Sequence, residues 1–508
     1  MLNLKNTFVS LTAMALFIAF TLPANGKQLV IGHSSLPVAL GNPLKDTSHS
    51  GGFVFGTVYD RLTISDKDGA KPALLTSWKV NADDKTKWTF KLRQGVKFHN
   101  GNDLTSSDVV SLINWLASDE GKVKAANTVR NLRNLKGAEV IDDYTLIVQS
   151  KKPDPLLPSL LGIIKQLDWE HVQDVTFDAV GKNPNGTGPY STVSWTQDKV
   201  EVKKFNNGWR PGKIDSISFR FLPELSARMA AFESNQIDLA FQMVADNKAK
   251  TESSNGKLIL SPGTAVSTLH FYSNQKGVPI SDVRVRQALN YGVNMQEYVD
   301  TMIGGATKVS GQPGTPNING YFDSIRPYPY NPEKAKSLLT AAGYGNGVEI
   351  IAESVVAQGD WKDIVQFVSS DLKKIGVTFT VRPITLPDLI ARVRDPSKFK
   401  DATVFSFNYG SEPTMDIMRS INGLHSCKSF MKWTCFEEIE GEISAANTEF
   451  NPTKRRQHLK NIAQYYHNQA ASIFLFESFD LDSVKNYVKD YRPINRLINW
   501  HEVRLEGK

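Results

Sequence analysis

A six-residue stretch at 408–413 combines side chains that suit the capture of a small polar molecule. It directly follows the strand-like run 404–407, and loops at strand ends are where α/β sheets usually bind ligands. Tyr409 offers an aromatic face with a hydroxyl, and Gly410 would let a ligand approach the backbone. Ser411 offers a hydroxyl acceptor, and Glu412 a carboxylate for an amine or cation. An ordinary turn that Pro413 closes is the alternative. The candidate ligand-binding residues of this stretch are Asn408, Tyr409, Gly410, Ser411 and Glu412.

Catalytic motifs are missing from the sequence. It contains no phosphate-binding GxxxxGK(S/T), no metalloprotease HExxH and no GxSxG nucleophile elbow. The nine histidines are dispersed without the spacing of metal ligands. Pairs of Asp and Glu abound, but a glycosidase pair is defined by its distance in space and not by its spacing along the chain. The sequence therefore predicts a protein without catalytic residues, bound metal or cofactor.

The two cysteines, Cys427 and Cys435, are eight residues apart. In an oxidising compartment such a pair forms a disulfide that closes a local loop. A thiol-based metal site is the alternative, but it would need more cysteines or a CxxC spacing. The pair therefore favours a disulfide.

Hydrophobic periodicity indicates the elements that must position these residues. A short apolar run predicts a strand at 29–31, and strand-like patterns predict others at 88–92, 96–98, 377–381 and 404–407. Apolar residues with helical spacing predict helices whose stripes lie at 109–116, 285–292, 335–342, 361–375 and 459–466. Predicted helix starts are a capping box of Thr105 and Asp108, Ser281 before the second helix, and Asn-Pro pairs at 331–332 and 451–452.

Helices and strands are interleaved in both halves of the chain, which predicts an α/β or α+β class. A chain of 508 residues is too long for one compact core, so two or more lobes are expected. No low-complexity linker separates them, which favours closely packed lobes that share a hinge. The hinge candidates are two extended segments, Ser267–Asn274 and Ser472–Leu481. If both cross between lobes, the C-terminal residues return to the first lobe.

The first 26 residues have the pattern of a cleaved secretory signal. Lys5 supplies a positive charge, Phe8–Leu22 is apolar, and the small residues Ala24 and Gly26 suit a cleavage site. A retained membrane anchor is the alternative, but the run is shorter than the ~20 residues of a bilayer span. No cysteine follows the apolar run, so we expect an exported protein that is not a lipoprotein.

The charge of the chain restricts its partners only weakly. Its formal net charge is +7, but the basic residues are scattered and form no Lys/Arg run. Without a basic patch or motif, a nucleic-acid partner is not expected. A mild positive field could favour anionic ligands, although net charge alone does not choose a partner.

A series of sequence blocks, in order, resembles family 5 of the extracellular solute-binding proteins, the receptors of dipeptide, oligopeptide and nickel importers. The resemblance extends from about residue 29 to the C-terminus. The blocks are Tyr59–Leu62, Pro72–Trp78, Trp88–Gly101, Leu104–Val109, Gly186–Tyr190, Asn207–Gly212, Asp282–Tyr291 and Asn331–Lys336.

This resemblance implies a two-lobe, periplasmic-binding-protein-like α/β fold of type II, cluster C. After a signal peptide at 1–26, residues 27–270 and 477–508 would form lobe I, with an extra subdomain at about 60–165, and 271–476 would form lobe II. It implies a monomeric periplasmic receptor that encloses a peptide or similar small polar solute and delivers it to an ABC permease in the inner membrane. It implies no chemistry on the solute, and the cysteine pair resembles the short-range disulfide of the dipeptide receptors.

Two departures from the dipeptide receptors change the expected ligand. Those receptors pair the peptide amine with an Asp that follows a Gly-Trp in the segment corresponding to 408–413, whereas here no Asp occurs until Asp416. They bind the peptide carboxylate with an Arg shortly before the helix at 361–375, and Val355–Gly359 contains none. A zwitterionic dipeptide would lose two charge-assisted contacts. Longer peptides, opine-like or sugar-derived solutes and a chelated metal therefore remain open.

Two further binding candidates come from the same segments. Gln358 is the polar residue that stands where the Arg is missing, and His425 lies where a nickel receptor would offer a histidine. A polar loop residue is the alternative for His425. Two other classes of function also remain. An exported hydrolase would show clustered titratable groups with perturbed pKa values, and a chaperone-like or adhesive protein would use an open cleft.

Overall fold

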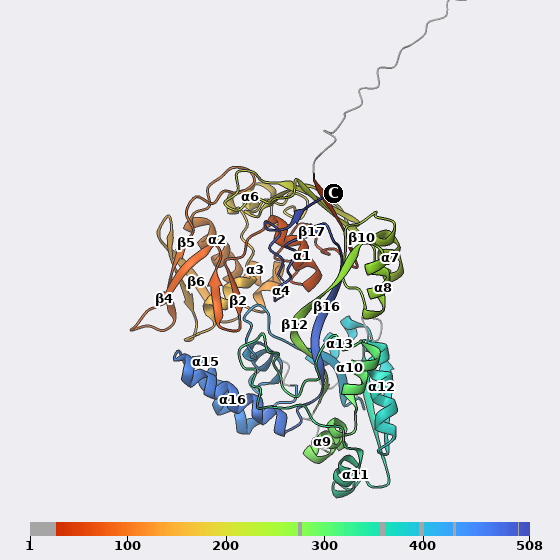
Figure 1. Cartoon of the computed structure of the whole chain (residues 1–508). Coiled ribbons are helices and arrows are strands. Elements are labelled where there is room, and N and C mark those ends of the chain that lie inside the picture. Colours follow the sequence, from red (N-terminus) through yellow and green to blue (C-terminus); the bar gives the residue numbers. More distant parts are fainter. Residues whose placement is uncertain (1–26, 273–276, 356–360, 396–400, 430–432, 496) are drawn as a thin grey trace, which may run out of the picture.

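One mixed sheet runs through the whole molecule and joins its two halves (Figure 1). The computed structural model describes residues 27–272, 277–355, 361–395, 401–429, 433–495 and 497–508. In spatial order the ten strands are β14 (Val377–Pro383), β13 (Val348–Ser354), β15 (Val404–Gly410), β12 (Gly256–Phe271), β16 (Ser472–Lys485), β11 (Leu239–Ala240), β1 (Gln28–His33), β10 (Ser216–Phe221), β9 (Lys199–Lys204) and β8 (Tyr190–Trp195). β1 lies parallel to β10 and β11, β13 lies parallel to β14 and β15, and the other pairs are antiparallel.

The buried apolar side chains divide the molecule into two lobes. We call the part whose cores draw on residues 29–243 and 484–505 the first lobe. The part whose cores draw on residues 266–476 is the second lobe. Burying large apolar side chains is the main favourable term in folding, so each lobe has a stabilising core of its own.

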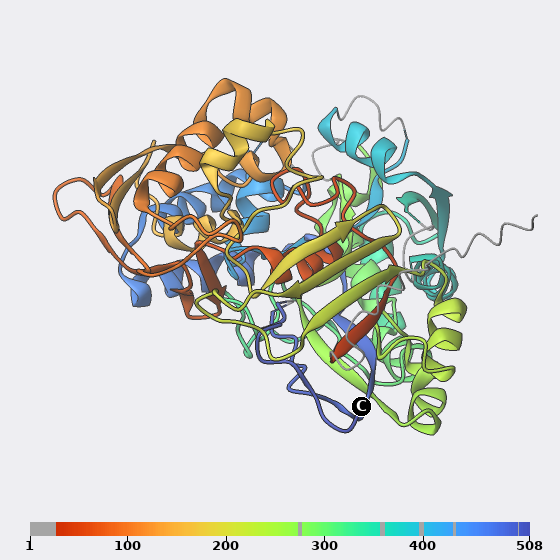
Figure 2. The same cartoon turned by 90° about the horizontal axis from the view of Figure 1, so that it is seen from above.

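The first lobe carries a second sheet beside the main one, and Figure 2 shows it projecting to one side. This sheet has the order β4 (Leu75–Val80), β5 (Lys87–Leu92), β7 (Thr145–Ser150) and β6 (Leu135–Asp142). The small strand pairs are β2 (Thr63–Asp66) with β3 (Gly69–Pro72) and β17 (Val488–Lys489) with β18 (Arg504–Leu505). The helices are α1 (His49–Val58), α2 (Ser106–Ala117), α3 (Asp119–Lys124), α4 (Ala126–Val129), α5 (Leu157–Leu160), α6 (Trp169–Val175), α7 (Leu225–Glu233) and α8 (Lys248–Ser253).

The second lobe covers its part of the main sheet with helices. They are α9 (Val283–Tyr291), α10 (Met295–Met302), α11 (Pro332–Ala341), α12 (Trp361–Lys373), α13 (Leu386–Arg394), α14 (Met418–Ser420), α15 (Glu440–Thr448) and α16 (Pro452–Asn468). The face of α12 that packs inward carries Ile364, Val368 and Leu372, which are spaced by four residues and are buried. Within the described ranges, no helix combines the length and the apolar character that crossing a bilayer requires.

The strands β12 and β16 pass from one lobe to the other. They pair with each other along most of their length, with a bulge between Pro262 and Val266. β16 also pairs with β11 of the first lobe, and β12 pairs with β15 of the second. The predicted hinge segments, 267–274 and 472–481, lie on these strands, except that β12 ends at Phe271 and residues 273–274 lie outside the described residues.

Most of the expected elements occur in the structure. The α/β class is confirmed, as are the capping box of α2 and the Asn caps of α11 and α16. Two local expectations are wrong. Asp282, not Ser281, caps α9, because its side chain accepts from the backbone N–H of Arg284. Residues 96–98 form no strand, because after the turn at Gly95 only Lys97 pairs, in an isolated bridge with Asp103.

Candidate ligand-binding site

The stretch 408–412 begins as a strand and not as a loop. β15 extends to Gly410, because β12 offers it a pairing partner as far as Ala265. Burial alternates along the stretch, so that Tyr409 and Ser411 are buried while the residues on either side of each are partly exposed. Successive strand side chains point to opposite faces. The partly exposed residues of the stretch are Asn408, Gly410 and Glu412.

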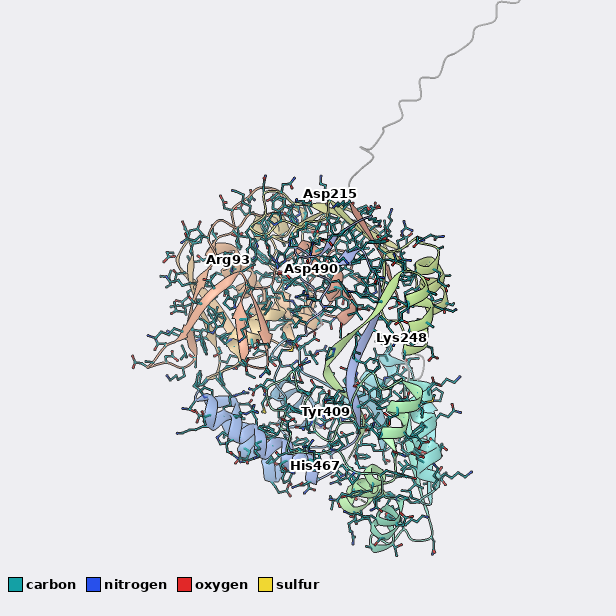
Figure 3. All side chains as sticks on the ribbon, viewed as in Figure 1. Arg93, Asp215, Lys248, Tyr409, His467 and Asp490 are labelled. Atoms are coloured by element: carbon teal, nitrogen blue, oxygen red, sulfur yellow. A yellow bond between two sulfur atoms is a disulfide. The ribbon has the colours of Figure 1, made fainter. Side chains whose placement is uncertain are left out.

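Tyr409 and His425 lie in the interior of the second lobe (Figure 3 labels Tyr409). Their rings stack with centroids 4.5 Å apart, and both side chains are fully buried. The Tyr409 hydroxyl lies 3.2 Å from the Ser472 hydroxyl. Burial lowers the pKa of His425 to about 3, so the imidazole is neutral. Aromatic packing accounts for both residues without a ligand.

His425 sits in a group of neutral rings and not beside charged ligands. The ring of His270 is 5.0 Å away, and burial, with His425 as a second cause, holds the pKa of His270 well below its usual range. His270 is hydrogen-bonded to Thr268 and Ser472. In the part of the chain that the structure describes, no three His, Cys, Asp or Glu side chains converge as metal ligands.

The predicted disulfide is confirmed. Cys427 and Cys435 are bonded, with 5.1 Å between their Cα atoms. The backbone N–H of Cys427 donates to Glu440 Oε1 at 2.6 Å, which fixes the start of the closed loop beside α15. The disulfide thus stabilises the segment that follows His425.

The polar groups of the stretch are only partly satisfied. Glu412 accepts a hydrogen bond from Thr264 Oγ1 at 2.8 Å. Asn408 Oδ1 and Ser411 Oγ are buried without a hydrogen-bond partner. A Cβ atom built on Gly410 would meet nothing within 4 Å, so there is open space beside this residue. Gln358, the candidate that stands where the dipeptide receptors have an Arg, lies outside the described residues.

Three basic side chains that the sequence patterns did not single out interact electrostatically with Glu412. Arg61 and Lys165 come from the first lobe and Arg419 from the second. The charge of Glu412 raises the pKa of each of them, against a larger lowering by burial. Lys165 had a detectable signal, because it interrupts the apolar run 160–164. Arg61 lies inside Tyr59–Leu62, one of the blocks that carry the family resemblance.

The first-lobe cations are held by a buried framework. Arg61 and Lys165 face each other in an isolated antiparallel bridge, and an Arg61 Nη donates to the Gly162 carbonyl at 3.0 Å. The preceding Asp60 accepts from Thr187 Oγ1 at 2.9 Å and from Trp209 Nε1 at 2.8 Å. Three separate sequence blocks therefore meet at Asp60, the residue before Arg61.

Two cavities lie next to these cations. One of 260 Å³ is lined by Arg61, Lys165 and the C-terminal segment 494–499. The other, of 310 Å³, is lined by first-lobe residues that include Arg130 and by second-lobe residues that include Arg419, so it lies between the lobes. A larger cavity of 460 Å³ is lined by second-lobe residues and by Glu477 at the lobe junction.

The sequence matches a known family and known relatives. The model of the bacterial extracellular solute-binding proteins, family 5 Middle, matches residues 69–428. The glutathione-binding protein GsiB of Salmonella paratyphi A is 30% identical over 328 residues, which are 63% of this chain and 62% of that protein. The chain thus spans less than two thirds of the length of the first curated relatives that it matches.

Solved structures share the fold over nearly the whole chain. The periplasmic binding protein DppA of Helicobacter pylori, in complex with the peptide STSA, has a TM-score of 0.78 at 22% identity and covers 95% of this chain and 98% of its own. MoaA of A. tumefaciens R10, in complex with mannopinic acid, has a TM-score of 0.74 at 21% identity and covers 95% and 100%. The two-lobe fold is therefore that of the periplasmic binding proteins.

Proposed function

The chain belongs to family 5 of the bacterial extracellular solute-binding proteins, and from that premise we propose that it captures a small polar solute between its lobes and delivers it to an ABC permease. The observation that carries the proposal is the group around Glu412. Its charged side chains come from both lobes, beside a cavity that both lobes line. A solute bound there contacts both lobes and so favours their closed arrangement.

Closure needs a flexible connection, and β12 with β16 supplies it. We propose that these strands bend near the bulge at 262–266, and that the lobe boundaries lie where the sequence predicts them, at 270–271 and 476–477. Two connections restrict the motion to a rotation about one axis. The extra subdomain at about 60–165 moves with the first lobe in this scheme.

The location of the protein is part of the proposal. The family is extracellular by its description. Residues 1–26, the predicted signal, lie outside the described residues. We propose that the signal is cleaved, that no lipid is attached, and that the mature protein acts as a monomer in the periplasm at the inner-membrane permease.

The proposed class of solutes is narrower than the range of solutes for which similar proteins are named. Similar proteins are named for glutathione, for a peptide and for mannopinic acid. Because the Asp and Arg of the dipeptide receptors have no counterparts at the corresponding positions, we propose a peptide-like or opine-like solute rather than a simple dipeptide. A metal chelate is less favoured, since His425 is enclosed by aromatic rings.

No chemistry on the solute is proposed. The lowered pKa of Lys165, about 7, is explained by burial and by the charge of Arg61. A hydrolase would need a second titratable group placed for proton transfer to the same atom. Turnover of a glycan or peptide panel, abolished in Glu412→Gln, would favour the hydrolase instead.

Native mass spectrometry of protein purified without denaturation tests the proposal. We expect one bound solute of defined mass, which is lost on unfolding. Adding it back should raise the Tm, since binding to the native state stabilises by RT ln(1 + [L]/Kd). Absence of a bound solute, together with no thermal shift from peptides, opines, sugars or metal chelates, would contradict it.

A further inference from the structure

We infer that the captured solute carries net negative charge, and that Arg61 and Lys165 of the first lobe and Arg419 of the second bind its anionic oxygen group. The inference rests on the proposed function and names the solute class for that same site. The group in question is a carboxylate or a phosphate, because both accept several charge-assisted hydrogen bonds.

Lys165 is the strongest single observation. Its side chain lines the 260 Å³ cavity, yet the residue is only 4% exposed. Its ammonium group makes no hydrogen bond or ion pair with any residue that the structure describes, and Nζ lies over the ring of Phe55, 5.2 Å from the centroid. Burying an ammonium group without a partner is costly. An anion in the cavity would supply that partner.

The acidic groups near Lys165 do not neutralise the site. The pKa of Lys165 is raised by Asp46 and Glu412 and lowered by Arg61. The Asp46 carboxylate accepts from the backbone N–H groups of Val38 at 3.1 Å and Ser48 at 2.7 Å. Glu412 is shared among three cations. Asp66, the carboxylate that lines the same cavity, pairs with Lys71 at 3.4 Å.

Arg419 brings the second lobe into the site. Its Nε is buried without a hydrogen-bond partner, and its side chain lines the cavity between the lobes. Burial, and then the charges of Arg130 and Arg133, lower its pKa to about 10. The acid in this cavity, Asp154, is bound by Asn134 and by the N–H of Leu156. The side chains that line this cavity with Arg419 are therefore more often basic than acidic.

The two sides of the site converge on Glu412. Its charge raises the pKa of Arg61, Lys165 and Arg419 alike, while Arg61 and Lys165 line one cavity and Arg419 lines the other. An anionic group placed among them would contact both lobes at once. Its charge would relieve the repulsion between the cations, and this gain would exist only in the closed arrangement.

The test uses thermal shift with a small-molecule extract of rich growth medium, separated by ion exchange into anionic, neutral and cationic fractions. The variant is Lys165→Met, and the matched control is Lys248→Met on the exposed outer face of α8 (Figure 3). We expect the anionic fraction alone to raise the Tm of the full-length mature protein. Lys165→Met should need at least ~10-fold more of it, and the control should match the wild type.

A second readout separates binding from packing. Without ligand, Lys165→Met should have a higher Tm than the wild type, because a buried unpaired cation is removed. Arg419→Gln, which changes only the second lobe, should also weaken the response to the anionic fraction. Phosphatase treatment of that fraction abolishes the shift if the group is a phosphate and leaves it if the group is a carboxylate.

Three results would overturn the inference. They are a shift from the neutral or cationic fraction, a Lys165→Met response equal to that of the wild type, and an unchanged response in Arg419→Gln. A wild type that responds to no fraction, and carries no solute in its native mass spectrum, would contradict the proposed function itself. The two failures are therefore distinguishable.

Discussion

Two groups of buried side chains, one around Tyr409 and His425 and one around Glu412, differ in the chemical type of their members. The group around Tyr409 and His425 is aromatic, and burial keeps its histidines neutral. The group around Glu412 contains Lys165 and Arg419, whose pKa values burial lowers to about 7 and about 10. Alternation along one strand separates the groups. Neutral buried rings stabilise a lobe by packing, whereas unpaired buried cations indicate a binding partner that is not part of the chain.

The largest expected effect comes from a substitution in the aromatic group. Tyr409→Ala removes a fully buried ring, so the free energy of unfolding should fall by ~3–5 kcal/mol. Denaturant titration measures it, with Tyr409→Phe as the matched control that loses only the hydroxyl contact with Ser472, ~1 kcal/mol. Solute affinity of the folded Tyr409→Phe protein should be unchanged. A Tyr409→Phe variant that is stable but does not bind would assign the ring to the ligand.

The disulfide gives the next largest effect. Replacing Cys427 and Cys435 together by Ser frees a loop whose ends are eight residues apart, and the free energy of unfolding should fall by ~2–3 kcal/mol. Because the loop adjoins the aromatic group and not the cations, the response to the anionic fraction should keep its midpoint at a temperature where the variant is folded. A lost response with unchanged stability would place the loop in the binding site.

The charged group should make the stability of the ligand-free protein depend on pH. Lys165 has a pKa of about 7 in the folded chain and its ordinary, higher pKa in the unfolded chain. The unfolded state therefore binds more protons between these values, and stability should rise as the pH rises from about 7 towards 10. Denaturant titrations at several pH values should show the rise in the wild type. Lys165→Met should lack this contribution, and an identical rise in both proteins would refute the assignment.

The smallest expected effect concerns a contact between the lobes outside the site. Phe450 of the second lobe lies against Trp88 of the first, with centroids 6.0 Å apart, and 5.8 Å from the Nζ of Lys85. Phe450→Ala should favour the open arrangement and weaken the response to the anionic fraction by ~2–10-fold, although Phe450 does not line the site. An unchanged midpoint would show that this contact does not contribute to closure.

Local patterns in the sequence were sufficient for the scaffold but not for the site. Alternation and capping located β5, α2, α11 and α16, because these signals lie within a few neighbouring residues. The end of β15 was misplaced, because its partner β12 is distant in the sequence. Tyr409 and Glu412 were expected to bind the same ligand. Only the three-dimensional pairing shows that strand alternation separates them.

The cations were missed for a related reason. Arg61, Lys165 and Arg419 are far apart in the sequence, and only Arg61 lies in one of the blocks that carry the family resemblance. They meet because separate sequence blocks pack around Asp60 and because the lobes lie against each other. Lys165 in an apolar run was the one local sign, since lysine is almost never fully buried without a partner.

The central claim is that an anionic solute draws the two lobes together. Both native cysteines are disulfide-bonded, so fluorophores can be attached to cysteines introduced as Asp83→Cys in the first lobe and Lys460→Cys in the second, both at exposed positions. Addition of the anionic fraction should raise the energy transfer between the labels. In the same protein carrying Lys165→Met, that rise should require at least ~10-fold more of the fraction. Constant energy transfer while the Tm rises, or equal closure with and without Lys165, would contradict the account.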